Sequence, residues 1–257
     1  PGRSTDAMPL LIACAMTMAE APAVTPPRTT RPRFAAEADR LASHLAALPA
    51  DELGRLLRVN AGLAAENRRR YLRFHDAPAH AALTAYTGVV FRHIAPERFT
   101  PEDFEYAQQH LHITSFLYGL LRPLDAIRSY RLEGDVVLPG EECSAFDFWR
   151  ARLTDGLLDA IRADDGVLVN LASSEMKRLF DWKRICREVR VIEPRFQLDE
   201  GGRLRTAVVY TKMCRGEMTR QLLCGRATDP EALRDFTWEG FRFDEARSTP
   251  NSPLFTM

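Results

Sequence analysis

The chain has 257 residues, and its 35 lysines and arginines are balanced by 35 aspartates and glutamates, so the formal net charge is zero. This balance argues against a histone-like protein that coats a polyanion. The hydrophobic fraction of 46% and the charged fraction of 27% are typical of a soluble globular protein and exclude disorder as the dominant state. Only three of the basic residues are lysines, which leaves 32 arginines.

Neither a membrane anchor nor a disulfide framework is indicated. The apolar stretch 8–18 is about half as long as a bilayer-spanning helix and lacks the flanks of a signal peptide. The five cysteines are an odd number without CxxC spacing. We therefore predict a cytoplasmic protein with no membrane partner. We interpret residues 1–7 as a disordered leader or an expression remnant and residues 8–257 as one domain.

The N-terminal part of the chain predicts a buried strand followed by helices. Residues 9–14 form a short apolar run typical of a strand, and the proline-rich stretch 21–33 is typical of a surface loop. From Phe34 onward apolar side chains recur every three to four residues, which predicts a helix with one buried stripe. A second helix is expected to open at 49–52 and a third to cover 62–72.

The rest of the chain predicts alternating helices and strands. Thr100-Pro101-Glu102-Asp103 supplies a cap, a first-turn proline and a carboxylate, so a helix should begin there and end near His110. Further helices are expected at 146–161 and 211–223. The remaining predicted strands are 167–169 and a hairpin in which 189–196 pairs with 203–210 through the turn 199–202. These elements indicate one α/β or α+β unit with a helical N-terminal layer.

Three ordered blocks of sequence resemble a known family, whereas the common phosphate-loop, dinucleotide, hydrolase and zinc-protease motifs are missing. The blocks are QQHLH followed by LYGLLRPLD and YRLE (residues 108–133), NLASSE (170–175) and KMCRGEMTR (212–220). They are similar to the AQQHLRxLSGLYGxLRPLDxxxPYRLEMG, NLASxEY and KKARGxMxR blocks of the peroxide-stress protein YaaA family. The similarity runs from about Met8 to Phe255.

The resemblance implies a compact fold with a central mixed β-sheet surrounded by helices, a helix-hairpin-helix element and a basic cleft. It also implies a cytoplasmic role in limiting peroxide damage, linked to control of free iron and to DNA binding.

Four lysines of the family pattern are replaced in this chain. Ungapped matching of the family segments SPAKT, SDKLA, FKGDVYTG and KKARG to residues 13–17, 60–64, 86–93 and 212–216 puts Met16, Gly62, Thr87 and Met213 at these lysine positions. If these positions line one cleft, that cleft is less cationic here and more apolar. Because each lost phosphate contact reduces the salt-dependence slope of DNA binding by about 0.9, we expect weaker DNA binding than in typical relatives.

A basic group in the predicted third helix and beside it is the candidate nucleic-acid face. A helix-hairpin-helix would place these side chains on phosphates, and the alternative is a solvated helix face. The group comprises Arg58, Arg68, Arg69, Arg70 and Arg73.

The family blocks also supply candidate residues for a small anionic ligand. Glu175 is the candidate general base, Lys212 a catalytic cation and Cys214 a candidate nucleophile beside two cations. The candidate substrate-binding residues are Arg131, Glu133, Asn170, Ser173, Arg215, Arg220, His112, His93 and Met16. The alternatives are structural ion pairs for the arginines, pairing between Arg131 and Glu133, and a helix cap formed by Ser173 or Ser174.

No cofactor is predicted, because the histidine, cysteine and methionine residues of the blocks lack fixed ligand spacing; a soft-metal or haem site is the minor alternative. Two functional hypotheses follow. The first is a YaaA-type stress protein that binds or guards DNA. The second is a repurposed enzyme that uses the same scaffold on a small anionic substrate, for instance in specialised metabolite biosynthesis.

Overall fold

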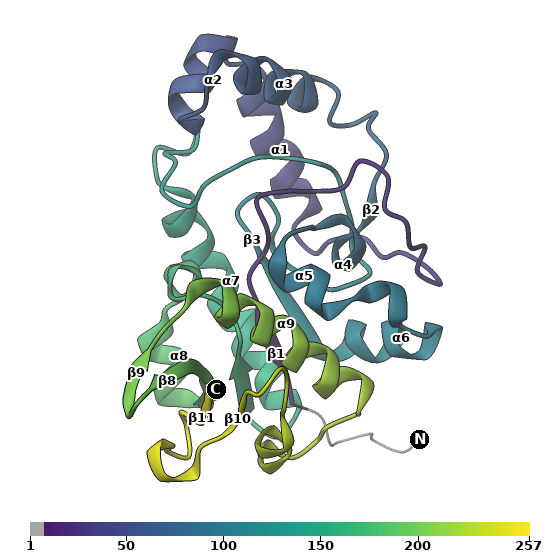
Figure 1. The fold of residues 1–257 in the computed structure, drawn as a ribbon. Helices are drawn as coiled ribbons and strands as arrows, with labels where there is room; N and C mark the ends of the chain where they lie inside the picture. Colours follow the sequence, from purple (N-terminus) through teal and green to yellow (C-terminus); the bar gives the residue numbers. More distant parts are fainter. Residues whose placement is uncertain (1–7) are drawn as a thin grey trace.

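A five-stranded mixed sheet lies at the centre of the structure, a computed structural model that describes residues 8–257 (Figure 1). Its strands, in spatial order, are β4 (Gly119–Leu121), β3 (Leu111–Ser115), β1 (Leu10–Ile12), β6 (Val167–Asn170) and β7 (Arg190–Ile192). All neighbours are parallel except the β3–β4 pair. Every residue of β1 is buried, as expected for a parallel strand covered on both faces.

Two smaller sheets complete the β-structure of the described residues. One has the order β10 (Arg242–Phe243), β11 (Leu254–Thr256), β8 (Arg195–Glu200) and β9 (Arg203–Arg205). The other pairs β2 (His80–Ala81) with β5 (Ala126–Ile127). The chain end therefore returns to pack as β11 beside β8, with which it is parallel.

Helices surround the sheets, as the sequence predicts for a mixed α/β fold. The α-helices are α1 (Ala35–Ala46), α2 (Ala50–Leu57), α3 (Ala61–Leu72), α4 (Ala82–Ala85), α5 (Val89–Ile94), α6 (Pro101–His110), α7 (Ala145–Ala163), α8 (Trp182–Glu188) and α9 (Val208–Cys224). Short 3-10 helices are η1 (Pro96–Arg98), η2 (Ser174–Leu179), η3 (Pro230–Asp235) and η4 (Glu245–Arg247). No helix in this part of the chain has the length and apolarity to cross a bilayer.

Most predicted elements are confirmed. The four helices expected between residues 34 and 110 are α1, α2, α3 and α6, and the predicted strands at 9–14 and 167–169 are β1 and β6. The start of α6 has a complete capping box between Thr100 and Asp103. The interpretation of residues 1–7 concerns a segment outside the described residues.

The predicted hairpin is correct at its turn and wrong at both ends. β8 and β9 pair through Gly201 and Gly202, whose φ angles of 67° and 91° suit a tight turn. Residues 190–192 instead form β7 of the central sheet, and Pro194, which has no N–H to donate, separates it from β8. Residues 208–210 begin α9 and their side chains are exposed, so their strand-like composition misled the prediction.

Candidate functional site

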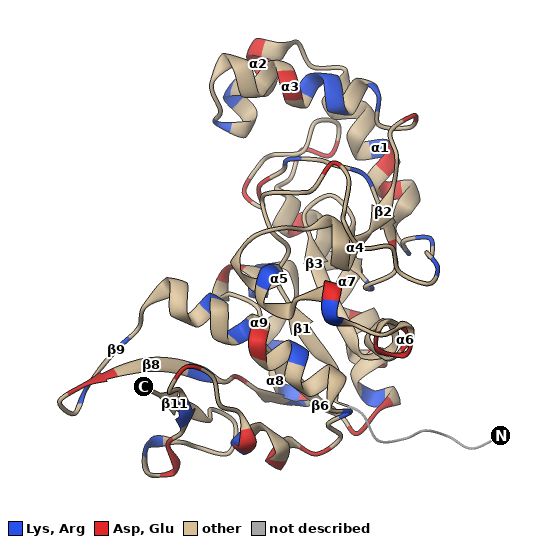
Figure 2. Cartoon of the chain, turned by 45° about the vertical axis from the view of Figure 1, so that its right-hand side comes forward, with Lys and Arg blue, Asp and Glu red and all other residues tan. Residues whose placement is uncertain are grey.

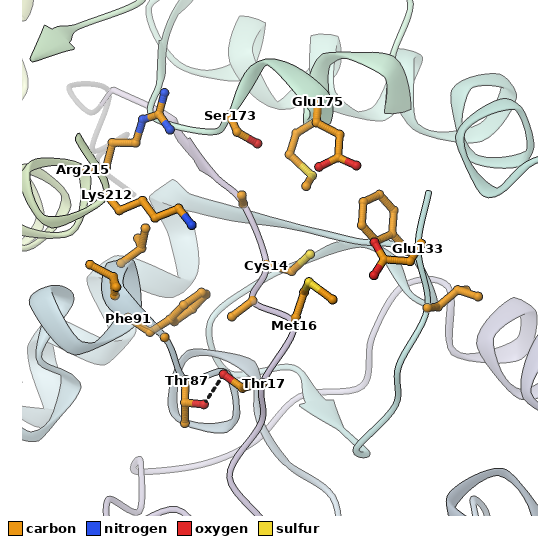
Figure 3. A pocket seen from close by; sticks show the side chains of 18 of the residues that line it. Cys14, Met16, Thr17, Thr87, Phe91, Glu133, Ser173, Glu175, Lys212 and Arg215 are labelled. Atoms are coloured by element: carbon orange, nitrogen blue, oxygen red, sulfur yellow. Dashed lines mark hydrogen bonds between the residues drawn. The ribbon is translucent and has the colours of Figure 1, made fainter. Parts of the chain in front are cut away.

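A cavity of about 350 Å³ opens at the carboxyl ends of the parallel strands. The segments that follow β1, β3 and β6 all contribute to its wall. Since β3 and β6 flank β1 on opposite sides, the chain order reverses at β1, and open α/β sheets place ligands at such a reversal. The lining residues labelled in Figure 3 are Cys14, Met16, Thr17, Thr87, Phe91, Glu133, Ser173, Glu175, Lys212 and Arg215.

Helix α9 supplies the cationic wall of the cavity. Lys212 and Arg215 are three residues apart and share one face of the helix, and both side chains reach toward the cavity in Figure 3. Partial burial lowers the pKa of Arg215 from its ordinary value, because the guanidinium has lost part of its hydration.

A close approach to α5 fixes the position of α9. A Cβ atom on Gly216 would lie 2.3 Å from the carbonyl oxygen of Val90, so only glycine fits there. In the next position Glu217 accepts a hydrogen bond from His93 of α5 at 3.1 Å if that nitrogen is protonated. Arg220 forms an ion pair with the same carboxylate. His93 and Arg220 therefore hold α9 in place and do not line the cavity.

Two carboxylates form the opposite wall. Glu133 lies on the irregular segment after β5, and Glu175 lies in η2, directly after β6 (Figure 3). Partial burial raises the pKa of Glu175, and the nearby carboxylates of Glu133 and Asp135 raise it further. Arg178 opposes this effect. A carboxyl group with a raised pKa is suited to general acid–base chemistry near neutral pH.

The segment that carries Glu133 is tied to the rest of the protein on both sides. The hydroxyl of Tyr130 bonds to Ser115 at 2.7 Å and to Tyr86 at 2.6 Å, and all three residues are buried. The carbonyl of Arg131 accepts a hydrogen bond from Tyr71 of α3. Arg131 lines the cavity, and its buried Nε has no hydrogen-bond partner among the described residues. Arg131 and Glu133 form no ion pair with each other in this part of the chain.

The floor of the cavity is apolar and sulfur-rich. Cys14 and Met16 follow β1 and lie between the two charged walls in Figure 3; Cys14 is half-buried and Met16 is 57% exposed. Burial raises the pKa of Cys14 to about 12, so its thiol is protonated at neutral pH and is a poor nucleophile. At one side of the floor Thr87 donates a hydrogen bond to Thr17 at 2.8 Å.

Ser173 and Asn170 take different roles although both follow β6. Ser173 occupies the cap position of η2, but its side chain makes no capping hydrogen bond and it lines the cavity. The side-chain Oδ1 of Asn170 accepts a hydrogen bond from the backbone N–H of Ala172 at 3.0 Å, so this buried side chain shapes the turn.

Two further candidates lie away from the cavity. Cys214 lies between Lys212 and Arg215 in the sequence, but it is on another face of α9 and is fully buried. Burial raises its pKa to about 12. His112 of β3 is buried beside a different cavity, of about 330 Å³, which contains Arg31, Arg33 and Arg122.

The four replaced lysine positions do not share one cleft. Met16 and Thr87 line the cavity, whereas Gly62 is exposed on α3 and Met213 of α9 does not reach the lining. The cavity is therefore less cationic than the family blocks imply at two of the four positions.

The candidate nucleic-acid face belongs to the α2–α3 pair, which projects from the upper end of the molecule in Figure 1. Arg58 pairs with Asp135 and Arg70 pairs with Glu66, both at 2.7 Å. The Nε of Arg68 donates to the carbonyl of Leu48 at 3.1 Å. The two members of the group without such a partner among residues 8–257 are Arg69 and Arg73. Figure 2 shows basic stretches on α3 and along α9, each of which also carries an acidic residue.

Sequence reasoning missed the aromatic part of the lining, which comprises Phe91, Phe116 and Tyr130. A usable signal exists for Phe116, because it is the first residue after β3 and so sits at the same sheet edge as Ser173. Within the described part of the chain no three His, Cys, Asp or Glu side chains gather closely enough to hold a metal ion.

Comparison with known proteins identifies the family to which the chain is similar. The family described as peroxide stress protein YaaA matches residues 8–247. A UPF0246 protein of Bacteroides thetaiotaomicron is 54% identical over 252 residues, which covers 96% of this chain and 98% of the relative. UPF0246 proteins of Phocaeicola vulgatus and Porphyromonas gingivalis are 52% and 45% identical, covering 97% of this chain and 99% and 100% of the relatives. The resemblance of the three sequence blocks is thus confirmed over nearly the whole chain, which belongs to the YaaA (UPF0246) family.

Proposed function

We propose that the cavity binds and transforms a small anionic molecule, and that this activity is how the chain takes part in the peroxide-stress role that its family description names. The observation that carries the proposal is the pair Lys212 and Arg215, which face the cavity with no carboxylate in ion-pair contact among the described residues. Arg215 is half-buried without an ion-pair partner, which disfavours its charged form, and a bound anion offsets that cost. Lys212 is exposed and adds a second positive charge beside it.

The chemistry of the two cations favours a carboxylate or phosphate. Arginine presents a planar fork of N–H donors that matches two oxygens at once, and lysine adds a compact charge. Ser173 adds a hydroxyl whose side chain makes no cap bond. These three side chains form one end of the site.

Glu175 is the group we assign to proton transfer. Its raised pKa increases the fraction of the protonated acid near neutrality and makes the carboxylate a stronger base. Neither Cys14 nor Cys214 is assigned a nucleophilic role, because burial raises the pKa of both thiols to about 12.

Anion binding is tested by calorimetric titration with 4-methylbenzoate, which carries one carboxylate on an apolar ring. Because hydrogen bonds to charged groups contribute about 1.5–3 kcal/mol, Lys212→Met with Arg215→Met should weaken binding at least about tenfold. Arg187→Met, an exposed change on α8 outside the cavity, is the matched control. Equal affinity in wild type and the double variant, or no binding by wild type at about 10 mM, contradicts the proposal.

The cellular role is tested in a Bacteroides thetaiotaomicron strain that lacks its 54% identical relative. We expect this chain, but not its Lys212→Met/Arg215→Met variant, to restore survival of a hydrogen peroxide challenge. Restoration by both at equal protein levels would separate the stress role from the cavity.

A second candidate function, DNA binding, is favoured by the position of Arg69 and Arg73 on the projecting α2–α3 pair. Two free arginines predict weak binding with a log–log salt slope of about −2. Anisotropy titration of bubble-containing and plain duplexes at low salt tests this, with Arg69→Ala/Arg73→Ala as the variant. Absence of binding below the micromolar range removes this candidate.

A further inference from the structure

The cavity has oppositely charged walls that do not neutralise each other. Figure 3 places Lys212 and Arg215 on one side and Glu133 and Glu175 on the other. Among residues 8–257 none of these four side chains takes part in an ion pair or a side-chain hydrogen bond. The protein thus holds two positive and two negative side chains apart across the cavity, and Arg131, a third lining cation, lies on the segment that carries Glu133. Arg215 and Glu133 are half-buried, whereas Lys212 and Glu175 are exposed.

Two features of this arrangement disfavour the charged groups when no ligand is present: Arg215 has lost part of its hydration, and the two carboxylates lie near each other. The two carboxylates repel each other, as the effect of Glu133 on Glu175 shows. The cations across the cavity do not approach either of them, because the floor of Cys14 and Met16 lies between the walls. Flexible side chains of opposite charge would be expected to form direct ion pairs. Their separation across the cavity therefore points to a ligand that contacts both walls.

We infer that the ligand is bipolar: a carboxylate or phosphate sits against Lys212 and Arg215, a protonated amine or amidine sits against Glu133 and Glu175, and an apolar body covers the floor. This inference rests on the proposed function and adds the cationic end of the ligand. In small-molecule sites, apolar side chains usually cover the body of the ligand and a few polar or charged groups fix its orientation.

An organic cation fits the acidic wall better than a metal ion. Only two carboxylates face this end, and within the described residues no third His, Cys, Asp or Glu completes a metal-binding group. The cavity lining also includes Met16, Met176, which follows Glu175 in sequence, and Phe116, and such sulfur and aromatic groups are suited to the alkyl or ring carbons next to an ammonium group.

Three probes of one shape test the inference on the full chain. 4-(Aminomethyl)benzoate carries both charges, 4-methylbenzoate carries only the acid, and 4-methylbenzylamine carries only the amine. We expect the bipolar probe to bind at least about tenfold more tightly than either of the others, because it adds one charge-assisted contact.

Variants of Glu133 and Glu175, the acidic wall, test whether these carboxylates cause the tighter binding of the bipolar probe. In Glu133→Gln/Glu175→Gln the bipolar probe should lose its advantage over 4-methylbenzoate, whose own binding should be equal to that in wild type or tighter because two negative charges are removed. The control is Glu52→Gln/Glu102→Gln, two exposed changes at the starts of α2 and α6. The melting temperature of each variant checks that it folds, and the comparison of the three probes on wild type stands even if the double variant does not.

The outcomes separate this inference from the proposed function. If wild type binds 4-methylbenzoate as tightly as the bipolar probe, or if the advantage survives in Glu133→Gln/Glu175→Gln, the bipolar ligand is overturned while anion binding stands. If no probe binds at about 10 mM, both fail.

Discussion

Glu175 lines the cavity, and its charged form has an energetic cost. It lies in η2 at the carboxyl edge of the sheet, close to two other carboxylates. Because its pKa in the folded protein is raised above the ordinary value of 4.5, the native state holds this proton more tightly than the unfolded chain does. The carboxylate therefore lowers the stability of the fold at every pH above about 4.5, and the loss is complete above the raised pKa.

The first prediction concerns Glu175→Gln. The neutral amide removes the charge, so the variant should be more stable than wild type at about pH 8, and the difference should vanish below about pH 4. Urea unfolding followed across this pH range measures it. Glu20→Gln, an exposed loop change outside the cavity, is the control. A variant less stable than wild type at about pH 8 would show that Glu175 is held by favourable contacts.

Helical periodicity explains which residues of α9 the sequence places correctly in the cavity lining and which it does not. Successive residues of a helix point about 100° apart, so Lys212 and Arg215 share a face and Cys214 between them points elsewhere. Proximity in sequence to two cations was the wrong criterion for Cys214; helical periodicity would have excluded it. The role of His93 was beyond reach, because its partner Glu217 is 124 residues away in the chain.

At the scale of elements, the packing of α9 on α5 decides where the cationic wall stands. The closest contact is at Gly216, where a Cβ would lie 2.3 Å from the carbonyl oxygen of Val90 and 2.6 Å from the Cβ of His93. Both neighbours belong to α5, one of them through its backbone, so neither can move aside without shifting the helix. A side chain at this position would push α9, with Lys212 and Arg215, away from the cavity.

The second prediction is that Gly216→Ala destabilises the protein by about 1–3 kcal/mol, the usual cost of overpacking a core contact. Weaker binding of 4-methylbenzoate should accompany the loss, because the same shift moves Arg215. Gly62→Ala is the matched control, since its Cβ would meet only Asn60 Oδ1 at 3.4 Å and the change should be neutral or stabilising by up to about 1 kcal/mol. Equal unfolding free energies for wild type and Gly216→Ala would mean that α5 yields without strain.

Element boundaries followed the sequence where local chemistry determines them. The capping box at Thr100 fixed the start of α6, and Gly201-Gly202 fixed the turn between β8 and β9. The start of α9 did not follow local composition, because Val208 and Val209 are exposed and the helix is held by its later, buried turns. The assignment of 190–192 to the central sheet depends on β6, more than twenty residues earlier, which no local pattern reveals.

At the scale of the whole molecule, two buried histidines make the stability of the fold depend on pH. His110 ends α6 and His112 lies in β3, and both are nearly inaccessible to solvent. Burial lowers the pKa of His110 to about 4, aided by Arg122 and Arg226, and the pKa of His112 to about 3, aided by Arg122 and His110. Both are therefore neutral in the native state at pH values where the unfolded chain binds protons, and stability must fall as the pH falls below 6.5.

The third prediction is that wild type loses about 2 kcal/mol of stability per histidine between pH 6.5 and about pH 5, a slope near 1.4 kcal/mol per pH unit for each. Replacing one of them, as His112→Asn, should reduce the slope by up to about 1.4 kcal/mol per pH unit, the contribution of one histidine. Urea unfolding at several pH values gives this slope independently of any constant destabilisation that the substitution causes. His75→Asn, at an exposed position after α3, should leave the slope nearly as in wild type. An unchanged slope in His112→Asn would mean that His112 takes up its proton in the folded protein, where Arg122 would then have to move away from it.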